Sequence, residues 1–77
     1  MSIEQQIHEA IAGAIPGAEI NVTGGGGHFE IHVVSEQFAG KRIIQKHRMV
    51  LSAIKGLMAG DNAPVHAIDK LVCELPA

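Results

Sequence analysis

The 77-residue sequence contains no tryptophan, no tyrosine and only two phenylalanines, Phe29 and Phe38. Proteins that bind single-stranded nucleic acids usually stack the bases on aromatic rings, so this composition argues against RNA binding. Hydrophobic residues nevertheless make up 47% of the chain. We therefore expect an aliphatic core, built mainly from isoleucine, valine, leucine and alanine.

Cysteine is equally scarce, because Cys73 is the only one. An internal disulfide is excluded, and a lone thiol without a signal peptide predicts a reducing, cytoplasmic location. No apolar run approaches the roughly 18 residues of a membrane-spanning helix, so no membrane association is expected. The length predicts a single domain over residues 1–77. We expect Cys73 to be a small buried apolar residue, with a ligand or redox role as the alternative.

Charge is distributed unevenly, although the net charge is only −2. No acidic residue lies between positions 41 and 55, and five of the six basic residues fall in that window: Lys41, Arg42, Lys46, Arg48 and Lys55. Two interpretations are open. The segment is either the solvated face of a helix or a surface for an anion such as DNA.

The spacing of apolar residues predicts a helix–strand–strand–helix–strand order, and hence an α+β fold. A capping box of Ser2 and Gln5 opens the first helix, which Pro16 and Gly17 end. Strands are expected over 18–23, 28–34 and 65–75, and the second helix over 41–59. The stripe expected to face inward on that helix consists of Ile43, Ile44, His47, Val50, Leu51, Ile54, Leu57 and Met58.

The connections between these elements predict the topology. A glycine hairpin makes the first two strands antiparallel, whereas a crossover helix favours parallel pairing of the second and third strands. We therefore expect a three-stranded mixed sheet with both helices on one face, and the other face left to solvent or a partner. Phe38, the one large apolar residue of a polar connector, is expected to plug the junction between the sheet and the second helix.

Four consecutive glycines over residues 24–27 precede His28, at the start of the second strand. A hairpin turn needs one or two, so the run indicates a turn that is thin, mobile or open to an approaching group. His28 is then reachable from outside, and His66 opens the last strand, near the hairpin if the strand order allows. Two imidazoles make an incomplete metal site, which a partner would have to complete. The alternative is that both are exposed histidines without a role.

Other residues give little sign of catalysis. No serine or cysteine has an evident histidine–carboxylate relay, and no pair of carboxylates lies in an apparent cleft. The G-x-x-G match within the glycines joins two strands rather than two helices, so we interpret it as accidental. We expect His47 to face the core, His32 and His8 to lie on the surface, and the protein not to be an enzyme.

Several motifs together resemble the BolA-like family. They are the His-Phe pair at 28–29 after the turn, the V-S-x-x-F-x-G-K run over 34–41, the K-H-R-M-V run over 46–50, and the His-Ala pair at 66–67. The resemblance covers about residues 19–67. It implies a fold akin to type II KH domains, with the element order predicted above.

The resemblance also implies a function. BolA-like proteins are partners of monothiol glutaredoxins, with which they share a [2Fe–2S] cluster whose thiolates come from the glutaredoxin cysteine and glutathione. His66 and His28 match the metal-ligating positions of the family. The chain is thus expected to be an adaptor in iron–sulfur cluster assembly, trafficking or iron regulation. The alternative is a DNA-binding transcription regulator that uses the basic helix over 41–55, and a homodimer is left open.

The last strand departs from the family pattern. Lys70 occupies a position that is usually apolar, and Pro76 comes ten rather than nine residues after His66. We expect a one-residue bulge near Asp69 and Lys70 that returns Leu71 to the core.

Overall fold

The computed structural model describes residues 2–77, so Met1, the first residue of the expected domain, lies outside the described residues. The observed order is α1 (Ile3–Ala14), β1 (Glu19–Gly25), β2 (His28–Val34), the short 3-10 helix η1 (Glu36–Phe38), α2 (Ile43–Ala53), α3 (Lys55–Met58) and β3 (Ala67–Glu74). The predicted order of helices and strands is confirmed, with the second helix divided in two.

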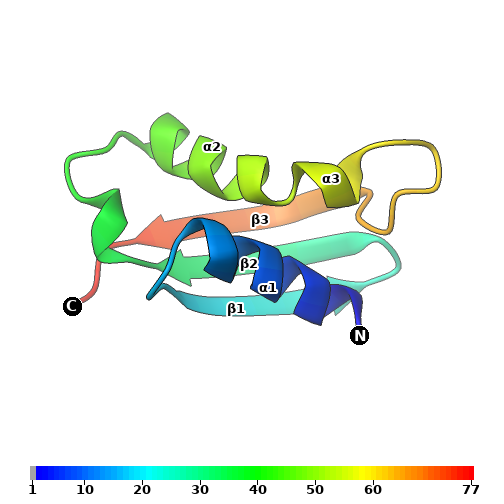
Figure 1. Ribbon diagram of the computed structural model, residues 1–77, viewed down its shortest axis with the longest axis horizontal. Helices are drawn as coiled ribbons and strands as arrows, with labels where there is room; N and C mark the ends of the chain where they lie inside the picture. Colours follow the sequence, from blue (N-terminus) through cyan, green and yellow to red (C-terminus); the bar gives the residue numbers. More distant parts are fainter. Residues whose placement is uncertain (1) are drawn as a thin grey trace.

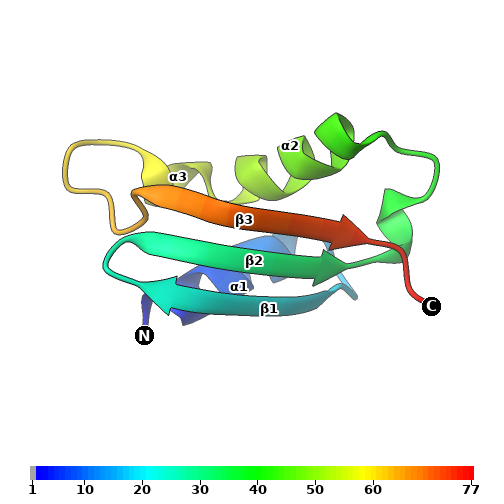
Figure 2. The ribbon, with the colours of Figure 1, turned by 180° about the vertical axis from the view of Figure 1, so that it is seen from behind.

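The three strands form one mixed sheet with β2 in the centre. β1 pairs with β2 in antiparallel fashion, and β3 pairs with β2 in parallel. The helices cover one face of the sheet (Figure 1), and seen from behind the strands lie in front of them with no covering element among residues 2–77 (Figure 2). The predicted α+β architecture is therefore confirmed. Within the described residues, no helix has the length and apolarity needed to cross a bilayer.

The core lies between the sheet and the helices and is almost wholly aliphatic. Burial of each large apolar side chain contributes about 1.5–3 kcal/mol to stability. Phe38 is fully buried where the chain leaves the sheet for α2, which confirms its predicted place as a plug. The fully buried side chains are Ile7, Ile11, Ile15, Ile31, Val33, Phe38, Val50, Ile54 and Val65.

Helix α1 begins with the predicted capping box. The Ser2 hydroxyl accepts a hydrogen bond from the Gln5 backbone N–H at 3.1 Å, and the Gln5 side chain accepts one from the Ser2 N–H at 3.1 Å. Two backbone donors that the helix itself cannot satisfy are thereby paired. The cap fixes the start of the helix, from which Ile7 and Ile11 face the core.

The second helix is shorter than predicted and is interrupted. It begins at Ile43, and the Arg42 N–H before it donates to the Gln45 side chain at 2.9 Å. Ile54, with φ −105° and ψ 10°, separates α2 from α3. Gly56 lies two residues beyond this break and lowers the cost of interrupting the helix, because glycine is a poor helix former.

The inward stripe predicted for this helix is wrong for three of its members. Ile43, Ile44 and Leu51 are 71%, 56% and 38% exposed, whereas Val50 and Ile54 are fully buried. Only the narrow side of α2 that contains Val50 meets the sheet. A helix resting on a small three-stranded sheet therefore buries a narrower stripe than its apolar residues suggest.

Strand β3 contains the predicted bulge. Phe29 pairs with Ile68, but the next residue of β2 pairs with Lys70, so Asp69 is the extra residue. The shift returns Leu71 to the side of the sheet that packs against the core. Lys70, which occupies a position that is usually apolar in the family, therefore lies on the open face of the sheet.

Candidate functional site

The β1–β2 hairpin uses only two of its four glycines as the turn itself. Gly25 pairs with His28, which leaves Gly26 and Gly27 as a two-residue turn with φ of 62° and 85°. Positive φ at both positions is the signature of a type I′ turn and suits glycine. Gly24 meets a different constraint, since a Cβ there would lie 2.3 Å from the His28 backbone oxygen. The turn is thin: close packing restricts Gly24 and Gly27 and positive φ favours glycine at Gly26, whereas a Cβ at Gly25 would meet open space.

His66 lies directly against this turn. The N–H groups of His66 and Ala67 both donate to the Gly27 carbonyl oxygen, at 2.8 and 3.0 Å. A Cβ on Gly27 would lie 2.9 Å from Cγ of the His66 ring. The ring therefore packs beside the residue that precedes His28. The hairpin and the loop before β3 lie at the same end of the sheet in both views, so the structure brings the two predicted ligands together (Figures 1 and 2).

The imidazole of His28 has a carboxylate partner. Its Nδ1 lies 3.2 Å from Oδ1 of Asp69, and the two side chains are 58% and 55% exposed. When Nδ1 carries the proton, it donates to Asp69 and leaves the Nε2 lone pair free for a ligand, an arrangement common around metal-bound histidines. Asp69 is the bulged residue. The bulge was predicted from the sequence, but this contact of the Asp69 carboxylate was not.

The donor set at this end of the sheet is incomplete for a metal. Within residues 2–77 no three or more His, Cys, Asp or Glu side chains are grouped closely enough to hold a metal ion. His28 and His66 are both exposed, and imidazole nitrogen is a good ligand for iron. The residues present would therefore fit a metal group only if another molecule supplied the remaining ligands.

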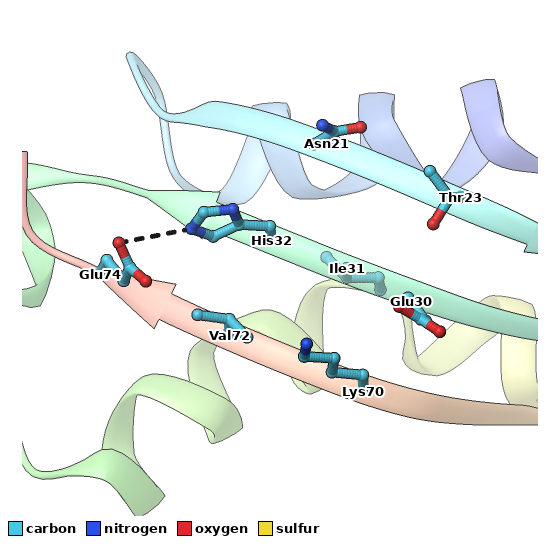
Figure 3. A pocket seen from close by; sticks show the side chains of 8 residues that line it. All are labelled: Asn21, Thr23, Glu30, Ile31, His32, Lys70, Val72 and Glu74. Atoms are coloured by element: carbon cyan, nitrogen blue, oxygen red, sulfur yellow. Dashed lines mark ion pairs between the residues drawn. The ribbon is translucent and has the colours of Figure 1, made fainter.

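A second histidine–carboxylate pair lies further along the open face. His32 Nε2 is 3.5 Å from Glu74 Oε2, at the edge of a shallow hollow that also contains Glu30 and Lys70 (Figure 3). The hollow measures about 300 Å³, the lower end of the range for small-molecule sites. Its charged, open lining suits solvent better than a substrate. His32 is exposed, as predicted.

Cys73 points toward the core side of β3, where it pairs with Val33 and packs against the buried cluster. Burial raises the pKa of its thiol, and the nearby charge of Lys46 lowers that pKa by a smaller amount. The thiol is therefore kept protonated at neutral pH, which makes it a poor metal ligand or nucleophile. Its position agrees with the prediction of a small apolar residue. His47 is half-buried, and His8 is exposed as predicted.

The basic residues over 41–55 are divided between surfaces: Lys46 lies apart from Arg48, whereas Lys41 lines a hollow together with Arg48. Lys46 is half-buried and close enough to Cys73 to act on its thiol, whereas Arg48 and Lys55 line a groove on the outer side of the helices. The exposed remainder, Lys41 and Arg42, precede α2. Among residues 2–77, the recorded ion pairs involve only histidines and carboxylates, so none of these cations is neutralised by a partner.

Comparison with known proteins agrees with this fold. The sequence model of the BolA-like protein family matches residues 2–72. The chain is 41% identical over 58 residues to Protein BOLA2 of Arabidopsis thaliana, across 74% of this chain and 58% of that protein. It is 33% identical over 64 residues to an uncharacterised protein from the rpoN–murA intergenic region of Acinetobacter guillouiae, across 83% of this chain and 75% of that protein. The chain thus matches less than two thirds of the first relative's length.

Solved structures show the same architecture. BolA1 from Arabidopsis thaliana superposes with a TM-score of 0.82 at 19% identity, over 99% of this chain and 94% of that one. A BolA homologue from Coxiella burnetii gives 0.79 at 27% identity, over 99% and 94%. Yeast Fra2 gives 0.69 at 35% identity, over 94% and 77%. The match of the family's sequence model to nearly the whole chain, together with these structures, shows that the chain belongs to the BolA-like protein family.

Proposed function

We propose that this chain is a non-enzymatic adaptor that binds a monothiol glutaredoxin and supplies His66 and His28 as ligands of a bridging [2Fe–2S] cluster. The glutaredoxin cysteine and glutathione would supply the thiolates. Such an adaptor would act in iron–sulfur cluster assembly, trafficking or iron regulation. The observation that most directly supports the proposal is the packing of the His66 ring on Gly27, the residue next to His28.

The chemistry of the donors is consistent with this role. Replacing thiolate ligands of a [2Fe–2S] cluster by imidazoles raises its reduction potential, so two histidines from this chain would tune a shared cluster. Only a neutral imidazole can ligate a metal, which makes the shared site sensitive to acid. Asp69 would hold His28 in one ring orientation. The Gly27 carbonyl fixes the backbone that carries His66.

The proposal can be tested by mixing this protein with a cluster-loaded monothiol glutaredoxin and glutathione, and recording visible absorption and circular dichroism. We expect the mixture to give a spectrum that neither protein gives alone, and His66→Ala and His28→Ala to abolish or alter it. His8→Ala is the matched control, because His8 is an exposed histidine on α1. A spectrum that is the same for wild type and His66→Ala would show that His66 is not a ligand.

Docking and ligation are separated by a second measurement. Calorimetric titration of the cluster-free glutaredoxin into wild type and His66→Ala reports association without the metal. We expect similar affinities, since a ligand acts on the cluster rather than on the protein–protein contact. An equal loss of affinity and of the spectrum would place His66 in the contact surface instead.

DNA binding is the second candidate, because Lys41, Arg42, Lys46, Arg48 and Lys55 have no ion-pair partner among residues 2–77. We rank it second because Lys46 lies toward Cys73 rather than beside Arg48. Phosphate contacts would make the affinity for DNA fall steeply with salt. A gel-shift assay at low salt with Arg48→Ala tests this, and no retardation of the duplex by the wild type would exclude it.

A further inference from the structure

The outer side of α2 carries apolar side chains that the fold leaves unused. Ile44 and Leu51 are two helical turns apart, so they lie on the same side of the helix. They are 56% and 38% exposed. A groove on this side is lined by Leu51 and Met58 together with Arg48 and Lys55. Apolar and cationic residues therefore alternate along one exposed strip.

The charge along this strip has one sign. The sequence contains no acidic residue between positions 37 and 60. Arg48 and Lys55 have no ion-pair partner among the described residues. A second hollow, lined by Lys41, Gln45, Arg48 and Ser52, adjoins the groove and extends the positive region toward the start of α2. The strip is thus complementary to a negatively charged ligand along its whole length.

We infer that this strip, which consists of the exposed Ile44 and the groove lined by Arg48, Leu51, Lys55 and Met58, docks an acidic amphipathic helix of a partner protein. Leucine-like side chains of that helix would cover Leu51 and Met58. Its carboxylates would pair with Arg48 and Lys55. Such a helix lays its apolar face into a hydrophobic groove, and Ile44 and Leu51, two turns apart on α2, offer exposed apolar contacts to that face.

The apolar residues favour a protein helix over DNA. A phosphate backbone presents charged and polar atoms, so it would cover Ile44 and Leu51 without removing any apolar surface of its own from water. A bilayer needs a wider apolar face than these exposed side chains provide. A second copy of this chain would have to offer an acidic helix, and only Glu4 and Glu9 on α1 are available.

The test uses a defined probe rather than an unidentified partner. A fluorescein-labelled peptide of about three heptads carries leucine at positions a and d and glutamate at e and g. Its binding to the full chain is followed by fluorescence anisotropy. We expect saturable binding that weakens about tenfold in the double variant Arg48→Glu, Lys55→Glu, since two ion pairs are lost. Lys70→Glu is the matched charge control, because Lys70 lies on the opposite, open face of the sheet.

The contribution of apolar contacts to peptide binding is tested with a matched pair of variants. Leu51→Ser should weaken binding several-fold, whereas Leu75→Ser, at a leucine that is 48% exposed beyond β3, should not. Both sites are on the surface, so circular dichroism should show an unchanged fold. The same peptide with lysine in place of glutamate should not bind.

Four results would overturn the inference. They are no saturable binding of the acidic peptide, equal effects of the Lys70 and Arg48/Lys55 variants, no effect of Leu51→Ser, and tighter binding of a labelled DNA duplex or of phosphatidylserine-containing vesicles through the same cations. The glutaredoxin proposal does not depend on the outcome, because none of these variants touches His28 or His66.

Discussion

Nδ1 of His28 lies 3.2 Å from Oδ1 of Asp69, across the seam between β2 and β3. The contact exists because β3 has one residue more than β2 needs at this point, and that residue is Asp69. A departure from the family's sequence pattern therefore places a carboxylate beside a candidate ligand.

If the proposed cluster is shared with a glutaredoxin, removing the Asp69 carboxylate should weaken its retention without harming the fold. We expect Asp69→Ala to reduce cluster retention in the mixed complex roughly tenfold, since such outer partners orient metal-bound histidines. Chelator competition followed by visible circular dichroism measures the loss. Glu74→Ala, which removes the carboxylate beside His32, should retain the cluster as wild type does. Equal losses in both variants would mean that Asp69 acts only through general surface charge.

The four glycines should differ sharply in their tolerance of alanine. Gly27→Ala should cost about 1–3 kcal/mol of unfolding free energy, because φ is 85° and the new Cβ would press on the His66 ring. Gly25→Ala should stay within about 0.5 kcal/mol, since its Cβ meets open space. Urea unfolding measures both. A flexible hairpin would instead accept the two substitutions equally well.

Deleting Asp69 should preserve the fold. Ile68 would remain on the core side, Lys70 on the open side and Leu71 on the core side, so the loss of stability should be about 1 kcal/mol or less. Deleting Val72 is the control, because it would turn Cys73 outward and Glu74 into the core, at a cost of several kcal/mol. Thermal unfolding by circular dichroism compares the two, and similar midpoints would contradict the observed register.

Alkaline pH should destabilise the protein partly through Cys73. Burial raises the pKa of this thiol above its ordinary value of 9.0, so the folded state holds the proton more tightly than the unfolded state. Its contribution is complete below pH 9 and is lost as pH rises through the folded pKa. Unfolding free energies measured on both sides of pH 9 should fall less steeply in Cys73→Ala than in wild type. Parallel curves would show that the thiol has no share in the pH dependence.

The sequence predicts the parts of this fold that local patterns determine. The Ser2 cap and the alternation in β2 follow from spacings within a few residues, and the bulge was predicted from the departure of β3 from the family's pattern. The side of α2 that meets the sheet cannot be derived from such spacings. Ile44 and Val50 are equally apolar, and only the packing of the whole helix decides which of them is buried. The break at Ile54 depends on the same packing.

The candidate site shows the same limit. The resemblance to the BolA-like family marked His28 and His66 as candidate ligands, but their meeting depended on the strand order, which the sequence left conditional. The contact between the His66 ring and Gly27 could not be inferred from either segment alone. The contact of Asp69 with His28 was not predicted, although the extra position of Asp69 in the strand was the available signal.

The parallel pairing of β2 with β3 has a consequence for how the site comes into being. A ribosome releases His28 well before His66, and chains generally begin to fold from their amino end during synthesis. The backbone contacts of His66 with Gly27 form only once the final strand has joined the sheet. A nascent chain that is still incomplete, or a chain truncated in the loop between α3 and β3 before His66, would contain only His28 of the pair. The proposed metal site, which needs both histidines, would therefore form only after β3 has joined the sheet.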